Sequence, residues 1–155
     1  MRGLRGCVLR RGAVAVHRFL GPTVAATRRW AGAAAPSTAT AFHTAADATI
    51  DRVMAAVEGA TEAAGEKLDD VEMSDGVLTV QTASGTFVLN KQAPKLQLWL
   101  SSPVSGPHHY DADPPFSDAA APGGAVAWKS DRDGHRLDRR LADELSSVLG
   151  TPVEC

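Results

Sequence analysis

The sequence contains little cysteine, few aromatic residues and no long apolar run. Its two cysteines, Cys7 and Cys155, stand at opposite ends of the 155 residues, which excludes a disulfide-stapled fold and a metal site built from several thiolates. A single terminal cysteine is also a poor candidate for a catalytic nucleophile. The absence of about 20 consecutive apolar residues argues against a membrane-spanning helix.

Several motifs of common enzymes are also missing. The chain has no Gly-rich phosphate loop, no Cys-x-x-Cys, and no Gly-x-Ser-x-Gly around Ser101 and Ser102. Nucleotide-phosphate binding and serine nucleophile chemistry are therefore not indicated. His108 and His109 are adjacent, which favours exposed residues at a strand end, with metal or proton binding as the alternative.

Acidic residues are absent from residues 1–46, which contain seven Arg and no Lys. This composition predicts a mitochondrial transit peptide at residues 1–30, with cleavage after Trp30, followed by a low-complexity linker at residues 31–43. A basic nucleic-acid-binding arm is the alternative. Residues 47–155 contain nine basic and eighteen acidic residues, and this negative charge argues against nucleic acid as a partner of the remaining chain.

Hydrophobic spacing predicts a helix at each end of the remaining chain. Apolar residues recur at positions 50, 53, 54 and 57, which predicts a helix from about Ala45 to Glu66, with Thr44 as its cap. Leucines at positions 137, 141 and 145 predict a second helix that ends at Gly150. Residues 151–155 then form a short C-terminal tail.

Between the helices, five to six short segments alternate apolar and polar residues, as strands do. Turn signals at Asp75-Gly76 and Ser84-Gly85 and the short connections predict an antiparallel meander. Residues 112–125 are rich in Pro, Gly and Ala, and we expect a flexible insertion there. The order predicts an α+β fold, a two-layer α-β sandwich with both helices on one face of an antiparallel sheet.

The other face of this sheet is expected to be open and to carry a tryptophan. In the strand around Trp99, Leu96, Leu98 and Leu100 take the core face, which leaves the indole outward. The same face is expected to carry Thr79, Gln81, Asn90, Gln92 and Gln97. An aromatic residue among groups that form hydrogen bonds is typical of a protein-binding surface.

Carboxylates form a band along residues 47–75, where nine of them face only two basic residues. Its candidate metal ligands are Asp47, Asp51, Glu58, Glu62, Glu66, Asp69, Asp70 and Asp75. Such oxygen ligands would bind hard or borderline cations weakly and exchangeably. A solvated face that maintains solubility and an attractive surface for a basic partner are the alternatives.

Four segments together resemble the frataxin family: DGVLTV at 75–80, FVLNKQ at 87–92, PKLQLWLSSPVSGPHHYD at 94–111 and DGHRLDRRLADELSSVL at 133–149. The resemblance implies a frataxin-like domain at residues 44–150 of a mitochondrial matrix protein. It implies weak binding of Fe²⁺ and Fe³⁺ on the carboxylate band. It also implies a role in iron–sulfur cluster assembly without catalysis by this chain, in which the protein stimulates sulfur transfer or donates iron.

The partners that the resemblance implies are a cysteine desulfurase with its accessory subunit, an iron–sulfur scaffold protein, and ferrochelatase for haem synthesis. It implies a monomer that forms oligomers with iron, and no membrane partner. The family's partner-facing surface maps onto Asn90, Lys91, Gln92, Pro94, Gln97, Trp99 and His109. A ferroxidase or iron-storage protein working on the carboxylate band is the alternative function, although no Glu-x-x-His pair of the ferritin type is present.

The chain also departs from the family pattern. Lys95-Leu96 replaces a common Asn-Lys, and Ala112 replaces a tryptophan. His109 stands where the family often has a basic residue that contacts partners, so we expect binding that is weaker or depends on pH. Arg136 replaces a serine cap, and we expect the second helix to fray at its start.

Overall fold

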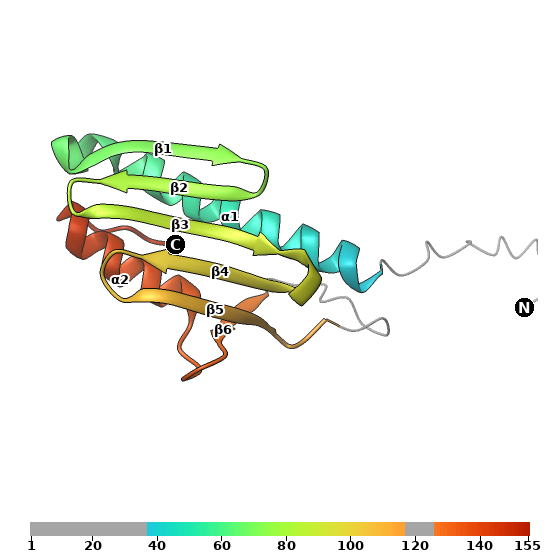
Figure 1. The fold of residues 1–155 in the computed structure, drawn as a ribbon. Helices are drawn as coiled ribbons and strands as arrows, with labels where there is room; N and C mark the ends of the chain where they lie inside the picture. Colours follow the sequence, from blue (N-terminus) through green and yellow to red (C-terminus); the bar gives the residue numbers. More distant parts are fainter. Residues whose placement is uncertain (1–36, 117–125) are drawn as a thin grey trace, which may run out of the picture. The chain divides into compact units, whose positions relative to one another are not determined.

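The structure, a computed structural model, describes residues 37–116 and 126–155. The predicted transit peptide at residues 1–30 lies outside the described residues. The elements in chain order are α1 (Thr38–Ala64), η1 (Gly65–Lys67), β1 (Leu68–Ser74), β2 (Val77–Thr82), β3 (Gly85–Gln92), η2 (Ala93–Lys95), β4 (Gln97–Ser102), β5 (Gly106–Asp113), β6 (Ala127–Ser130) and α2 (Leu137–Leu149) (Figure 1).

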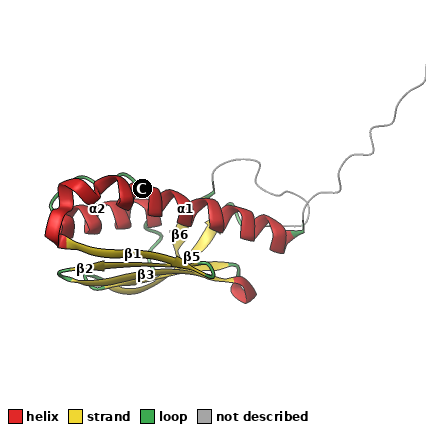
Figure 2. Cartoon of the chain, turned by 90° about the horizontal axis from the view of Figure 1, so that it is seen from above, coloured by secondary structure: helices red, strands yellow, loops and turns green. Residues whose placement is uncertain are grey.

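The strands form one antiparallel sheet in the order β1-β2-β3-β4-β5-β6, so each strand pairs with its neighbour in the sequence. Both helices lie on the same face of this sheet, and its other face has no covering layer in the described part of the chain (Figure 2). The predicted two-layer α-β sandwich is confirmed. Short connections favour pairing between strands that are neighbours in the sequence, because antiparallel strands can be joined by tight turns.

The core lies between the sheet and the helices. Alternate strand residues point into it, and the buried ones include Leu78, Val80, Phe87, Leu98 and Leu100, each at most 2% exposed. From α1 the core receives Phe42, Ile50 and Val57, and from α2 it receives Leu137, Leu141 and Leu145. Within the described residues, no helix is long and apolar enough to cross a membrane.

Helix α1 begins at Thr38, so the prediction of a start near Ala45 was wrong, as was the assignment of residues 38–43 to a linker. Ser37, not Thr44, caps the helix, and its Oγ accepts a hydrogen bond from the Thr40 amide at 3.2 Å. Phe42 is fully buried and packs edge-to-face against Trp128. Alanine favours helix, and one buried aromatic ring anchors these otherwise featureless turns.

The start of the predicted flexible insertion and the C-terminal tail both pack against the domain. Strand β5 continues to Asp113, so Ala112 is buried within the sheet rather than opening a flexible insertion. Phe116 then packs against Phe42, and residues 117–125 lie outside the described residues. In the C-terminal tail, Val153 is 4% exposed and its amide donates to Ser146 Oγ at 2.9 Å.

Candidate functional site

The open face of the sheet brings together residues from three neighbouring strands. Strand pairing places Asn90 opposite Trp99, and Trp99 opposite His109, so these three side chains form a row across β3, β4 and β5. Gln92 pairs with Gln97 in the adjacent row. We call these five residues, Asn90, Gln92, Gln97, Trp99 and His109, the docking surface.

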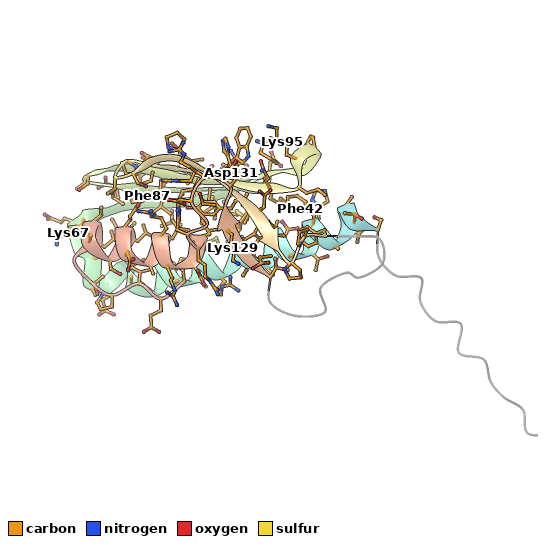
Figure 3. The ribbon with its side chains drawn as sticks, turned by 90° about the horizontal axis from the view of Figure 1, so that it is seen from below. Phe42, Lys67, Phe87, Lys95, Lys129 and Asp131 are labelled. Carbon is orange, nitrogen blue, oxygen red and sulfur yellow. The ribbon has the colours of Figure 1, made fainter. Side chains whose placement is uncertain are left out.

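Trp99 points outward, as the alternation predicts, but its neighbours leave it only partly exposed. Its ring stacks on the His109 imidazole, with centroids 4.3 Å apart. Its Nε1 donates to Gln97 Oε1 at 3.0 Å, and Lys95 Nζ lies 5.5 Å from the ring centroid. Figure 3 places Lys95 on the side of the sheet away from the helices. The indole is therefore held in a defined position, which lowers the entropy lost on binding a partner.

His109 and Gln97 connect this indole to carboxylates at the margin of the docking surface. His109 Nδ1 lies 3.4 Å from Asp131 Oδ2, and the Asp131 amide donates to the His109 carbonyl at 3.0 Å. Gln97 Nε2 donates to Asp111 Oδ1 at 2.9 Å. The orientation of Trp99 thus depends on two partners that are themselves fixed.

Lys91 and Pro94 stand apart from the docking surface. Lys91 shares the sheet face of Leu89, and its Nζ pairs with the carboxylate of Asp47 on α1, which leaves its side chain 18% exposed. Pro94 is exposed in η2, at the end of β3. The structure therefore joins a residue expected to bind partners to one expected to bind metal.

The carboxylates of the predicted band are spread over several elements. Asp51, Glu58 and Glu62 lie on α1, and all three are exposed. Glu66 lies in η1, Asp69 and Asp70 lie on β1, and Asp75 follows β1 in the turn to β2; these four are also exposed. We call these seven residues, without the paired Asp47, the acidic ridge.

No closed metal site is formed along this ridge. Among the described residues, no group of three or more His, Cys, Asp or Glu is placed to hold a metal ion. The oxygen donors fit hard or borderline cations such as iron. The ridge carboxylates are spread out and exposed, which fits ions that each contact only one or two carboxylates and exchange readily.

Sequence reasoning missed a polar network beneath α2. His108 and Tyr110 point to the helix side of β5, with 9% and 0% exposure, although His108 was considered as an exposed strand-end residue. His108 Nε2 contacts Ser105 Oγ at 2.8 Å, and Tyr110 Oη contacts His135 Nε2 at 2.9 Å. The period-two alternation of a strand could have predicted this, because it places residues 108, 110 and 112 on the same face of β5.

A buried carboxylate completes this network. Glu144 on α2 is 6% exposed and accepts a hydrogen bond from Ser102 Oγ, while its second oxygen lies 3.6 Å from Arg140. Ser102 Oγ also accepts from the amides of Val104 and Ser105. Burial lowers the pKa of His108, and repulsion from protonated His135 and from Arg140 lowers it further, while burial raises the pKa of Tyr110.

Comparisons with known proteins support the resemblance drawn from the sequence. A family model for the frataxin-like domain matches residues 35–151. The frataxin-like mitochondrial protein of Leishmania donovani is 50% identical over 111 residues, which are 71% of this chain and 56% of the relative. The mitochondrial frataxin homolog of Schizosaccharomyces pombe is 37% identical over 114 residues, 73% of this chain and 66% of the relative. The chain therefore spans between half and two thirds of these curated relatives' length.

Solved structures agree with the fold. A trimeric frataxin from Saccharomyces cerevisiae, complexed with ferrous iron, matches 69% of this chain and 87% of its own, with 33% identity and a TM-score of 0.57. A frataxin from Psychromonas ingrahamii matches 75% of this chain and 95% of its own, with 20% identity and a TM-score of 0.53. The second match supports the fold alone.

Proposed function

Because the chain belongs to the frataxin family and is a mitochondrial protein, we propose that it promotes iron–sulfur cluster assembly by binding a cysteine desulfurase–scaffold complex. The observation that carries this proposal is the row of Asn90, Trp99 and His109 on the open sheet face. It offers a large aromatic anchor among amides that hydrogen-bond across an interface, which is the composition of a binding hot spot.

In the proposed mechanism, this chain performs no covalent chemistry. Trp99 and the neighbouring amides dock at the junction of desulfurase and scaffold, and the complex is held in the arrangement that passes sulfur to the scaffold. This is a shift in the population of partner conformations, so its size is limited by the difference in affinity for the two arrangements. The accessory subunit is part of the assembly that is bound.

We further propose that the acidic ridge carries iron as cargo. Its support is the set of seven exposed carboxylates and the ferrous complex of the Saccharomyces cerevisiae relative. Hard oxygen donors bind Fe²⁺ without the closed geometry of a storage or di-iron site, which suits delivery to the assembly complex or to ferrochelatase. Oxidation of Fe²⁺ on the ridge is a weaker candidate, since the described residues form no preorganised cluster.

The test is sulfide production by a reconstituted desulfurase–accessory subunit–scaffold complex at fixed iron concentration. We expect the wild type to stimulate sulfide production. The Trp99→Ala variant should stimulate it less, because loss of an aromatic hot spot weakens binding to the complex by roughly 2 kcal/mol or more. Val104→Ala is the matched control, because Val104 is 58% exposed in the β4–β5 turn and lies outside the docking surface. Equal stimulation by wild type and Trp99→Ala would show that the docking surface is not the working surface.

A further inference from the structure

A hydrogen-bonded path connects a fully buried tyrosine to the protein surface. Tyr110 is the only tyrosine in the chain, and its side chain has no solvent exposure. Its Oη lies 2.9 Å from Nε2 of His135, and Nδ1 of the same ring contacts Asp133 Oδ1. The side chains of His135 and Asp133 are 19% and 53% exposed, so the path ends in water.

The partners of His135 define which of its nitrogens carries a proton. Hydrogen bonds from His135 and Ser130 lower the pKa of Asp133 to about 2, so its carboxylate is ionised and accepts a hydrogen bond from Nδ1–H. Nε2 of the neutral ring is then left with a lone pair, which accepts the hydrogen bond of the Tyr110 hydroxyl. This tautomer is the arrangement of a base waiting for the phenolic proton.

The surroundings of Tyr110 and His135 include both a buried side and an open cleft. His108 packs edge-on against His135, with ring centroids 5.1 Å apart, on the buried side. On its other side, His135 lines an open cleft together with Gly134, Arg136, Arg139, Arg140 and Asp143. Within the described residues, His135 is the hydrogen-bond partner shown for the Tyr110 hydroxyl.

We propose that Tyr110 is a redox-active residue that gives one electron to an oxidant formed when ferrous ion meets peroxide, with His135 as its proton acceptor. The oxidant gains one electron. The phenolic O–H bond breaks, an N–H bond forms at Nε2, and a neutral phenoxyl radical and an imidazolium remain. Asp133 balances the imidazolium charge. A soluble one-electron reductant restores the electron, and Nε2 returns the proton to the phenol.

This activity would intercept oxidising equivalents inside the protein that carries ferrous iron. It rests on the proposed iron binding by the acidic ridge but not on the docking surface, so it can fail while the proposed role of the docking surface in cluster assembly holds. The chemistry needs a base within hydrogen-bonding distance of the phenol, and the 2.9 Å contact supplies it.

The test is photochemical one-electron oxidation of the full chain with a ruthenium polypyridyl complex and persulfate, followed by electron paramagnetic resonance and transient absorption. Since Tyr110 is the sole tyrosine, any phenoxyl signal belongs to it, and Tyr110→Phe provides the blank. We expect the phenoxyl radical in the wild type, formed more slowly in deuterium oxide. His135→Gln should slow its formation by about 100-fold or more, the usual contribution of a positioned base. His43→Gln, an exposed histidine on α1, should leave the rate unchanged.

Asp133→Asn provides a second variant at a largely exposed position, for the case in which His135→Gln does not fold. It removes the charge that holds the imidazolium, and we expect slower radical formation with the fold retained in thermal unfolding. A rate that is unchanged in either folded variant, no solvent isotope effect, or oxidation of tryptophan alone in the wild type would overturn the proposal.

Discussion

His108 shows how a single residue couples this fold to pH. It is 9% exposed, and its pKa is lowered from 6.5 first by burial and then by electrostatic repulsion from His135, in its protonated form, and from Arg140. Arg132 acts in the same direction, and Glu144 opposes it. The neutral His108 ring has a hydrogen-bond partner in Ser105. Protonation would place a positive charge in a buried position near other cationic side chains, which is unfavourable.

The prediction at this position is a loss of stability in acid. Because the folded-state pKa lies below the unfolded value of 6.5, the unfolded chain binds more protons as pH falls through that value. The contribution of His108 to the free energy of unfolding should therefore be constant well above pH 6.5 and decline as the pH falls through 6.5 toward the lower folded-state pKa. Urea unfolding at several pH values measures it.

The His108→Gln variant isolates that effect from the other titrating groups. Gln keeps a polar side chain that contacts Ser105 but does not titrate, so its unfolding free energy should fall less steeply in acid than that of the wild type. His43→Gln, at an exposed position, should follow the wild type. Parallel curves for the wild type and His108→Gln would contradict the assignment.

Lys91 marks the limit of residue-level prediction from sequence. Its alternation with Leu89 was visible, but its partner Asp47 lies 44 residues earlier in the chain. Which carboxylate it meets depends on where α1 crosses the sheet, and no local pattern specifies that crossing. The same holds for the contact between Tyr110 and His135, which are 25 residues apart.

At the scale of elements, the first turns of α1 are the clearest case for a test. Phe42 is fully buried, with ring centroids 5.9 Å from Phe116 and 6.0 Å from Trp128. Phe42→Ala should lower the free energy of unfolding by about 3–5 kcal/mol, the usual cost of removing a buried phenylalanine. His43→Ala, one residue along on the exposed side, should cost less than about 0.5 kcal/mol.

Denaturant unfolding of both variants gives this comparison. A small loss for Phe42→Ala would mean that residues 38–43 behave as the linker that the sequence predicted. Residues 38–43 contain one large apolar residue, Phe42, and their two alanines carry little signal of burial, which explains the difficulty. The burial of Phe42 against the rest of the core decides the structure.

The strands were more predictable than this helix start. Period-two alternation in residues 77–82, 85–92 and 97–102 identified the core face of each strand, and the tight turns left one simple strand order. The two-layer fold followed because both helices had to bury their apolar stripes. Leu96 was expected in the strand of Trp99, but it adopts a left-handed conformation after η2, and β4 begins at Gln97. The contacts of Trp99 with Gln97 and His109 could not be predicted, because they depend on side-chain conformations in the folded sheet.

At the scale of the whole domain, the docking surface and the acidic ridge occupy different elements. The docking surface crosses β3, β4 and β5 on the open face, whereas the ridge follows α1, η1 and the β1 edge. If the proposed functions are correct, partner activation and iron binding should be separable by mutation. A single shared site would instead couple them.

The separating variant is Glu58→Gln with Glu62→Gln, which removes two exposed charges one helical turn apart. We expect lower capacity for Fe²⁺ in anaerobic calorimetry and unchanged stimulation of sulfide production at matched iron. Relief of like-charge repulsion should raise the free energy of unfolding by about 0.2–0.5 kcal/mol. The control is Asp143→Asn with Glu154→Gln, which removes the same charge at exposed positions outside the ridge and should leave iron capacity intact. Loss of stimulation with complex formation preserved would show instead that the ridge itself drives activation, and that iron carried there reaches the assembly complex as part of the activating step.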